Sequence, residues 1–260
     1  MFRWDLVWQY LLLQDPDKLF LSALWTTVWI SVLAQFIGVV LGLFLALMRM
    51  SRYPFLTWPA RAYIWFFRGS PLLVQVLLLW DGLPRVLNNP NLLLPAWACV
   101  VVAFSLNEGA YMSEIVRAGI TSVDAGQMEA AKSLGMRFSL AMRRIILPQA
   151  ARVIIPPLGN EFNNMLKTTS IASVIGLVEL TGTAENYGAI SFSIFELLIV
   201  STVYYLLLTT IWGYIQGWIE NRLDPNRKLK TEINQKSFAN RMLGFGTSKT
   251  GGAGTLASGR

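Results

Sequence analysis

The 260-residue chain is 54% hydrophobic and only 14% charged, whereas globular domains average roughly 25% charged residues. It contains no histidine and one cysteine, Cys99, which argues against a haem, zinc or histidine-based catalytic site and excludes an intrachain disulfide. Several apolar runs exceed the ~18 residues typical of a membrane-spanning helix, so the composition predicts an all-α integral membrane protein.

Residues 1–18 are predicted to form an N-terminal interfacial segment. The apolar stretch 6–13 contains Gln9 and is followed by QDPDK, without the small-residue cleavage site of a signal peptide. The aromatic residues Phe2, Trp4, Trp8 and Tyr10 suit a short amphipathic segment that lies on the membrane face.

Five membrane spans follow, at about residues 19–48, 62–82, 92–116, 153–178 and 193–219. The second to fourth spans contain charged residues, among them Arg68, Glu108, Glu161 and Lys167. A charge at the bilayer centre costs ~2.5–3.5 kcal/mol on insertion scales, so such residues usually face the bundle interior or water. We expect these three spans to line a pathway and the first and fifth spans to face lipid. Alternatively, Arg68 and Lys167 lie near the interface and extend their charges towards it.

Positive charge alternates between the connecting segments. Arg49, Arg52 and Arg61 separate the first two spans, and six basic residues lie between the third and fourth. The segment between the second and third spans has only Arg85, and residues 179–192 have no Lys or Arg. The positive-inside rule then predicts an N-terminus outside and a C-terminus inside. The net charge of +7 arises mainly in the tail. Residues 223–260 should therefore form a basic, disordered cytoplasmic tail.

Two proline-containing stretches interrupt the spans. Gly69-Ser70-Pro71 either only breaks the second span, because proline lacks a backbone donor, or forms irregular backbone beside a substrate cavity. Pro156-Pro157 is expected to kink the entry to the fourth span.

A basic insert at residues 124–148 lies on the cytoplasmic side of this topology. Residues 129–134 are good helix formers, Gly135 suits a helix C-cap or a close backbone approach, and residues 138–147 predict a second helix that ends at Pro148. Such a compact helix–glycine–helix knob is suited to fit a groove on a partner protein.

The insert also matches the spacing E-A-A-x₃-G-x₉-I-x-L-P through Glu129, Ala130, Ala131, Gly135, Ile145, Leu147 and Pro148. This resembles the ATPase-coupling motif of membrane subunits of bacterial ATP-binding-cassette (ABC) importers. The stretches FRGSPLLVQ (67–75), 110–136 and 146–176 resemble the polar amino-acid uptake permeases, relatives of the histidine, glutamine, arginine and glutamate permeases. The resemblance covers about residues 20–222. Asn107-Glu108-Gly109 departs from it by being more polar, which we interpret as tuning the substrate preference.

The resemblance implies a type I ABC importer fold for residues 19–222, in the bacterial cytoplasmic (inner) membrane. It implies an extracytoplasmic amino-acid-binding protein, a second permease subunit that is identical or a sister chain, and an ATPase dimer that binds ATP and Mg²⁺. No Walker motif is present, so ATP chemistry and its cofactors are expected on the partner chains. A nucleic-acid partner is not expected.

A set of polar residues is expected along the substrate pathway: Arg68, Gly69, Ser70, Gln75, Glu108, Tyr111, Asn160, Glu161, Asn164, Lys167, Thr168 and Ser170. Asn164 and Thr168 share the helix face of Glu161, because they follow it by three and seven residues. The Glu161 carboxylate needs a counter-charge or several hydrogen bonds, and two candidate cations are Arg68 and the ammonium group of a passing amino acid.

Two other classes of function remain to be weighed. A self-contained channel or secondary transporter of small polar solutes would need its own coupling site and usually internal repeats, neither of which is visible. A membrane-embedded enzyme would lack catalytic residues in this histidine-free chain. Co-purification with an ATPase chain distinguishes an importer subunit from both.

Overall fold

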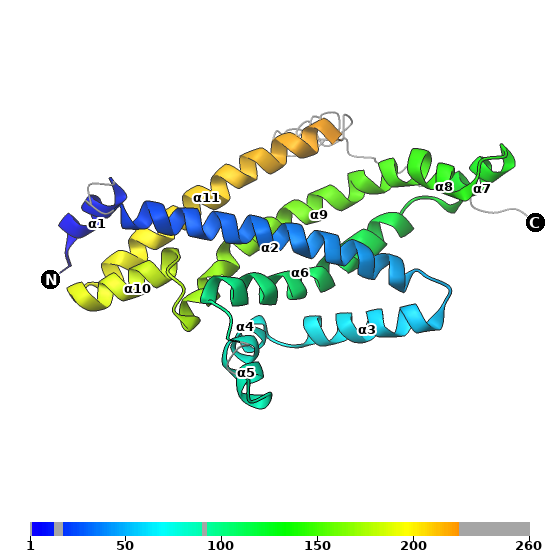
Figure 1. The fold of residues 1–260 in the computed structure, drawn as a ribbon. Coiled ribbons are helices and arrows are strands. Elements are labelled where there is room, and N and C mark those ends of the chain that lie inside the picture. The colour runs from blue at the N-terminus through cyan, green and yellow to red at the C-terminus, as the bar shows by residue number, and fades with distance from the viewer. Residues whose placement is uncertain (1, 13–17, 90–92, 224–260) are drawn as a thin grey trace, which may run out of the picture. The chain divides into compact units, whose positions relative to one another are not determined.

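The computed structural model describes residues 2–12, 18–89 and 93–223 (Figure 1), and these residues contain helices and no strand. This confirms the all-α prediction. The chain divides into two units, residues 1–218 and 219–260, and the described part of the second is the end of the last helix. The predicted disordered tail lies almost entirely outside the described residues.

Two long helices, α2 (Leu19–Arg49) and α6 (Ala96–Thr121), pack along each other (Figure 1). Glycines allow this close approach. A Cβ atom on Gly42 would lie 2.3 Å from the Cβ of Met112, and one on Gly38 would lie 2.6 Å from the Cγ of Glu108. Gly38 and Gly42 form the small-x-x-x-small pattern that lets helix backbones approach closely in membranes.

The predicted second span is sharply bent. It consists of α3 (Pro54–Gly69), α4 (Leu72–Leu77), a π-helical turn at Leu78–Gly82 and α5 (Leu83–Val86), with a bend of 105° after α3. The interruption that the sequence predicts at Gly69-Ser70-Pro71 is therefore present. The chain leaves helical geometry at Ser70, which is extended, and Pro71 has no N–H with which to continue the ladder. The Nε2 group of Gln75 closes the corner by donating to the backbone oxygens of Phe67 and Ser70, at 3.0 and 3.1 Å.

The coupling insert contains α7 (Ala125–Ser133), α8 (Phe138–Ala141) and a π-helical turn at Met142–Ile146. Gly135 has φ +76°, and the N–H groups of Gly135 and Met136 donate to the carbonyls of Lys132 and Ala131. This is the Schellman arrangement that ends a helix at a left-handed glycine. Helix–glycine–helix geometry is thus present, with the glycine acting as a C-cap.

The prediction that the second helix ends at Pro148 is wrong. The chain passes from the π-helical turn directly into α9 (Leu147–Thr168), with Pro148 in its first turn. Leu147 donates to the carbonyl of Met142, five residues back. The wider turn therefore directly precedes Pro148, whose ring would clash with the carbonyl four residues back in a regular α-helix. Pro156 and Pro157 lie inside α9.

The chain continues through a 3₁₀ segment (Thr169–Ile175) into α10 (Leu180–Ser191) and α11 (Ile194–Leu223). The N-terminal segment contains α1 (Trp4–Leu11), which buries Val7 in an apolar cluster with Phe20, Leu180 and Tyr204. Trp4 and Trp8 stay exposed. The buried face of α1 thus packs on protein, and the location of this segment on the membrane face stays a prediction.

By length and composition, α2, α6 and α11 could each cross a membrane, and α3 with α4 and α5 gives a bent fourth candidate among the described residues. Helix α9 is long enough but too polar to be counted among these candidates, so the five-span count stays a prediction. Helix α11 is mostly exposed and α6 mostly buried, as the lipid-facing and interior assignments require. Helix α2 is intermediate, because Ile30 and Ala34 are fully buried in the core.

Candidate functional site

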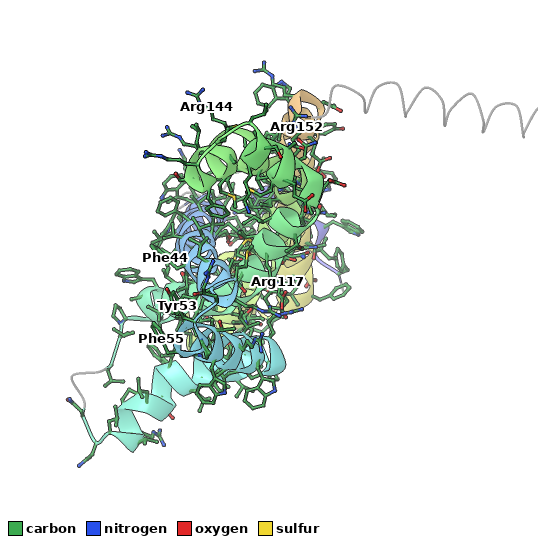
Figure 2. All side chains as sticks on the ribbon, turned by 90° about the vertical axis from the view of Figure 1, so that its right-hand side faces the viewer. Phe44, Tyr53, Phe55, Arg117, Arg144 and Arg152 are labelled. Atoms are coloured by element: carbon green, nitrogen blue, oxygen red, sulfur yellow. The ribbon has the colours of Figure 1, made fainter. Side chains whose placement is uncertain are left out.

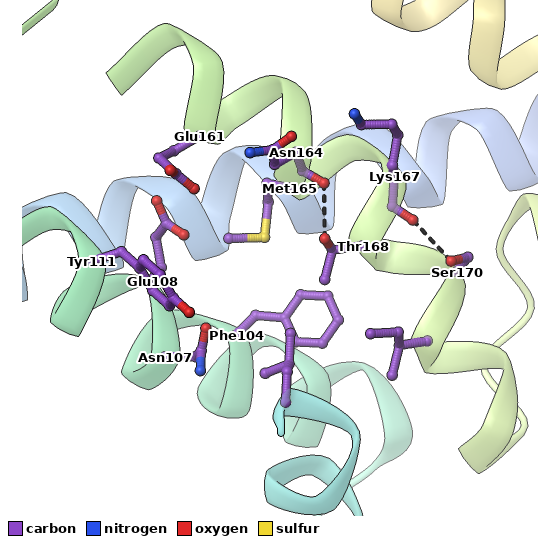
Figure 3. Close-up of a pocket in the computed structure, with 12 residues that line it drawn as sticks. Phe104, Asn107, Glu108, Tyr111, Glu161, Asn164, Met165, Lys167, Thr168 and Ser170 are labelled. Atoms are coloured by element: carbon purple, nitrogen blue, oxygen red, sulfur yellow. Dashed lines mark hydrogen bonds between the residues drawn. The ribbon is translucent and has the colours of Figure 1, made fainter. Parts of the chain in front are cut away.

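A cavity of about 550 Å³ lies between α6, α9, the 3₁₀ segment and the start of α4 (Figure 3). This volume falls within the roughly 300–1,000 Å³ range of small-molecule sites. The lining residues are Leu72, Phe104, Asn107, Glu108, Tyr111, Glu161, Asn164, Met165, Lys167, Thr168, Ser170 and Ile171. The structure thus brings together seven of the residues expected along the substrate pathway, from two predicted spans.

The centre of the cavity is acidic. Glu108 on α6 and Glu161 on α9 point their carboxylates towards each other (Figure 3). Glu108 is only 5% exposed, and it accepts a hydrogen bond from the Nε2 group of Gln35 at 3.0 Å. Within the described parts of the chain, neither carboxylate forms an ion pair with an arginine or lysine. A buried carboxylate such as Glu108 is costly without a counter-charge, and Glu161 beside it is half-buried, so the cavity can accommodate a ligand with a positive group.

The wall beside Glu161 is polar, as the helical spacing predicts. Asn164 and Thr168 both line the cavity, and the Thr168 hydroxyl donates to the Asn164 carbonyl at 2.9 Å. The side chain of Lys167 extends away from the two carboxylates (Figure 3), so it does not neutralise them. On the opposite wall, the Asn107 amide donates to the backbone oxygen of Phe67 at 2.9 Å. Asn107 and Glu108, which are more polar than the resemblance to the amino-acid permeases leads one to expect, therefore both line the cavity.

Five of the expected pathway residues lie elsewhere. Ser70 and Gln75 hold the bend after α3, since the amide of Gln75 also donates to the Ser70 hydroxyl at 2.8 Å. Asn160 accepts a hydrogen bond from Gln216 on α11 at 2.9 Å. Gly69 and Arg68 line a separate cleft.

The proposed pairing of Arg68 with Glu161 is wrong. The guanidinium of Arg68 donates to Glu114 at 3.2 Å and lies 5.3 Å from the centre of the Tyr111 ring. Helix α6 supplies this acceptor from a residue that the sequence reasoning did not single out. Glu161 is therefore left without the protein cation that the sequence suggested.

Glu114 is the main residue that the sequence reasoning missed. Its carboxylate is 23% exposed and accepts from Arg49 on α2, from Arg68 on α3 and from Arg117 on α6. It therefore joins three helices. Two features of the sequence could have indicated Glu114. It is an acid within an apolar helix, and Arg117 follows it by three residues, a spacing at which side chains on one helix meet.

The coupling-motif residues divide between surface and interior. Ala131 is buried, whereas Glu129, Ala130, Gly135, Leu147 and Pro148 are exposed and Ile145 is half-buried. Leu134 and Phe138, on either side of Gly135, are also exposed. Arg144 projects from the surface of the same region (Figure 2). This surface can take a partner, and the coupling role itself stays a prediction.

No group of three or more histidine, cysteine, aspartate or glutamate side chains is arranged to hold a metal ion within the described ranges. The polar groups that line the cavity are carboxylates, amides and hydroxyls. These groups can hold and orient a small polar solute.

Comparison with known proteins identifies the fold. The chain is 41% identical over 237 residues to the arginine transport system permease protein ArgU of Corynebacterium glutamicum, covering 86% of this chain and 72% of the relative. It is 41% identical over 204 residues to the octopine transport system permease protein OccM of Rhizobium meliloti, covering 76% and 83%. A crystal structure of an amino acid ABC transporter with histidines matches with a TM-score of 0.75 and 42% identity, covering 82% of this chain and 98% of that one.

The chain consequently has the type I ABC importer permease fold that the sequence resemblance implied. The relatives are transport subunits, so it is a permease subunit and neither a self-contained channel nor an enzyme. Residues 38–225 match the family profile of the binding-protein-dependent transport system inner membrane component. The chain belongs to this family of inner membrane components of binding-protein-dependent transport systems.

Proposed function

We propose that this permease subunit carries a polar amino acid with a cationic group, and that the cavity between α6 and α9 is a binding site on its path. The observation that carries the proposal is the pair of facing carboxylates, Glu108 and Glu161, without a protein cation beside them. An amino acid supplies an ammonium group, and a basic amino acid supplies a second cation. The arginine and octopine permeases among the relatives support this substrate class.

Each wall of the cavity has a part in binding. Glu108 and Glu161 attract the positive group, and a charge-assisted hydrogen bond contributes more than a neutral one. Asn107, Asn164 and Thr168 offer polar groups along the rest of the ligand. Binding by a few polar contacts suits a transporter, because the substrate must leave again.

The assembly that we propose places the N-terminus outside and the C-terminus inside the inner membrane, with α9 as a fifth span. The alternation of basic and uncharged connecting segments supports this sidedness. An extracytoplasmic binding protein delivers the amino acid, and a second permease copy or sister chain completes the path. An ATPase dimer contacts the exposed coupling surface and supplies the ATP and Mg²⁺ sites, so this chain carries no cofactor.

The test replaces each carboxylate by its neutral isostere, Glu108→Gln and Glu161→Gln. The assembled complex is reconstituted into proteoliposomes, and arginine uptake, ATP hydrolysis and complex yield are measured together. Loss of one charged hydrogen bond, worth about 1.5–3 kcal/mol, predicts uptake affinity reduced by about tenfold or more, with basal ATP hydrolysis retained. Glu185→Gln, on the exposed face of α10, is the matched control. Unchanged uptake and selectivity in both cavity variants would refute the substrate role.

A further inference from the structure

A concentration of positive charge surrounds the corner between α2 and α3. Two clefts share Arg49 and Arg61 as lining residues. One cleft, of about 330 Å³, also contains Arg52 and lies against the first turns of α3. The other, of about 460 Å³, reaches Arg68 and Glu114. Together they form the basic groove.

The charge of this groove is not balanced within the described residues. Glu114, the acid that lines the larger cleft, already accepts from Arg49, Arg68 and Arg117. Arg52 and Arg61 form no ion pair with any described residue, and no acid lines the smaller cleft. Like charges held together repel one another. The groove therefore favours an anion from outside the chain.

Exposed aromatic residues surround the same corner. Trp58 and Trp65 on α3 are 74% and 77% exposed. Tyr53 and Phe55, at the start of α3, project together from the surface, with ring centres 5.7 Å apart (Figure 2). Tryptophan and tyrosine concentrate at the headgroup level of membrane proteins. Their position places the groove at the depth where lipid phosphates lie.

We infer that the basic groove binds the phosphate of an anionic phospholipid in the cytoplasmic leaflet. Arg52 and Arg61 donate to the phosphate together with Arg49, because planar guanidinium groups match phosphate oxygens in pairs. The exposed rings of Trp58 and Trp65 contact the apolar part of the lipid. Basic pockets between membrane helices on the cytoplasmic side bind such headgroups. The leaflet assignment rests on the sidedness in the proposed function.

Free phosphate and a substrate carboxylate share the anionic chemistry but have no acyl chains for the exposed indoles to contact. The lipid uses both halves of the site, the guanidinium groups and the aromatic rim. The two alternatives are therefore separable by experiment.

The test titrates phosphatidylglycerol into the detergent-solubilised permease–ATPase complex and counts bound lipid by native mass spectrometry, with phosphatidylcholine as the neutral probe. The double variant Arg52→Gln/Arg61→Gln should bind phosphatidylglycerol about 30-fold more weakly, since each basic residue near a membrane surface contributes about 1 kcal/mol. Arg52→Lys/Arg61→Lys should retain most of the binding. Arg3→Gln/Arg85→Gln removes equal charge from arginines outside the groove and should bind like the wild type.

Several outcomes would overturn the assignment. These are equal phosphatidylglycerol binding in the glutamine double variant, equal binding of phosphatidylcholine by the wild type, and displacement of the lipid by inorganic phosphate or by arginine at buffer concentrations. ATP-driven uptake is measured separately. A complex that transports without the lipid preference contradicts only the lipid site, whereas intact lipid binding without uptake contradicts only the proposed function.

Discussion

Replacement of Gly42 by alanine tests the packing that holds the cavity wall in place. The added Cβ would lie 2.3 Å from the Cβ of Met112, 2.9 Å from the backbone nitrogen of Ser113 and 3.0 Å from the carbonyl oxygen of Gly109. Two of these atoms belong to the backbone of α6, so no side-chain rotation relieves the contact. Helices α2 and α6 must separate locally.

The magnitude follows from comparison with a second glycine. Forcing an extra methyl group into a packed interior costs about 1–3 kcal/mol, while alanine in a helix is favoured over glycine by about 0.5–1 kcal/mol. Gly213→Ala, on α11, has the same helical gain, but nothing lies within 4 Å of its new Cβ. The difference between the two variants therefore isolates the clash. Gly213→Ala should be neutral or stabilising. The free energy of unfolding of Gly42→Ala should be about 1–3 kcal/mol lower than that of Gly213→Ala.

The assay is thermal unfolding of the purified complex in one detergent, with both variants compared with the wild type. At roughly 2–4 °C per kcal/mol for a chain of this size, the two midpoints should differ by about 2–12 °C, with Gly42→Ala the lower. Equal midpoints would show that α2 and α6 are not packed as closely as described, and the reasoning would fail.

Three further predictions concern the knob, the topology and the ionic centre. Gly135→Asp should abolish uptake while membrane insertion persists, because in the proposed assembly the added negative charge would face the ATPase. The neutral Gly135→Asn, which also tolerates positive φ, should keep substantial uptake. Equal loss of uptake in both variants would exclude the charge effect. In a Cys99→Ala background, Asn186→Cys should react with an impermeant thiol reagent added outside intact cells, and Ser139→Cys should not. Asn186 is chosen because it is exposed, whereas the neighbouring Ala184 is buried. The reverse labelling pattern would overturn the proposed sidedness. Glu114→Gln should lower the yield and the thermal midpoint of the complex, because three arginines lose their shared carboxylate. A partly buried charge left unpaired costs about 1–3 kcal/mol. An unchanged midpoint would show that Glu114 does not hold the three helices together.

Features set by neighbouring residues could be predicted from the sequence. The charge-free run 19–48 almost coincides with α2, which ends at Arg49. The polar face of Glu161, Asn164 and Thr168 follows from helical periodicity alone, and all three line the cavity. The turn at Gly135 follows from the absence of a side chain at positive φ.

Features set by contacts between distant segments could not be predicted from the sequence. Arg68 of α3 meets Glu114 of α6, which is 46 residues away in the chain, and the sequence around Arg68 does not indicate this acceptor rather than Glu161. The sequence predicts the interruption at Gly69-Ser70-Pro71 but not its angle of 105°, and it does not indicate that Asn107 of α6 donates to Gln75 beyond the bend at 3.2 Å. The continuation of the helix through Pro148 depends on a wider turn that precedes the proline, which propensity does not indicate.

The unbroken passage from the π-helical turn into α9 connects the helix–glycine–helix insert directly to the wall of the cavity. Leu147 and Glu161 lie 14 residues apart on this helix, which at 1.5 Å per residue is about 21 Å. Pro156 and Pro157 remove the donors for the carbonyls of Arg152 and Val153, so the helix bends most easily just below Glu161. A push on the knob would pivot the upper arm about these prolines and move the Glu161 carboxylate relative to Glu108, opening or closing the space between them.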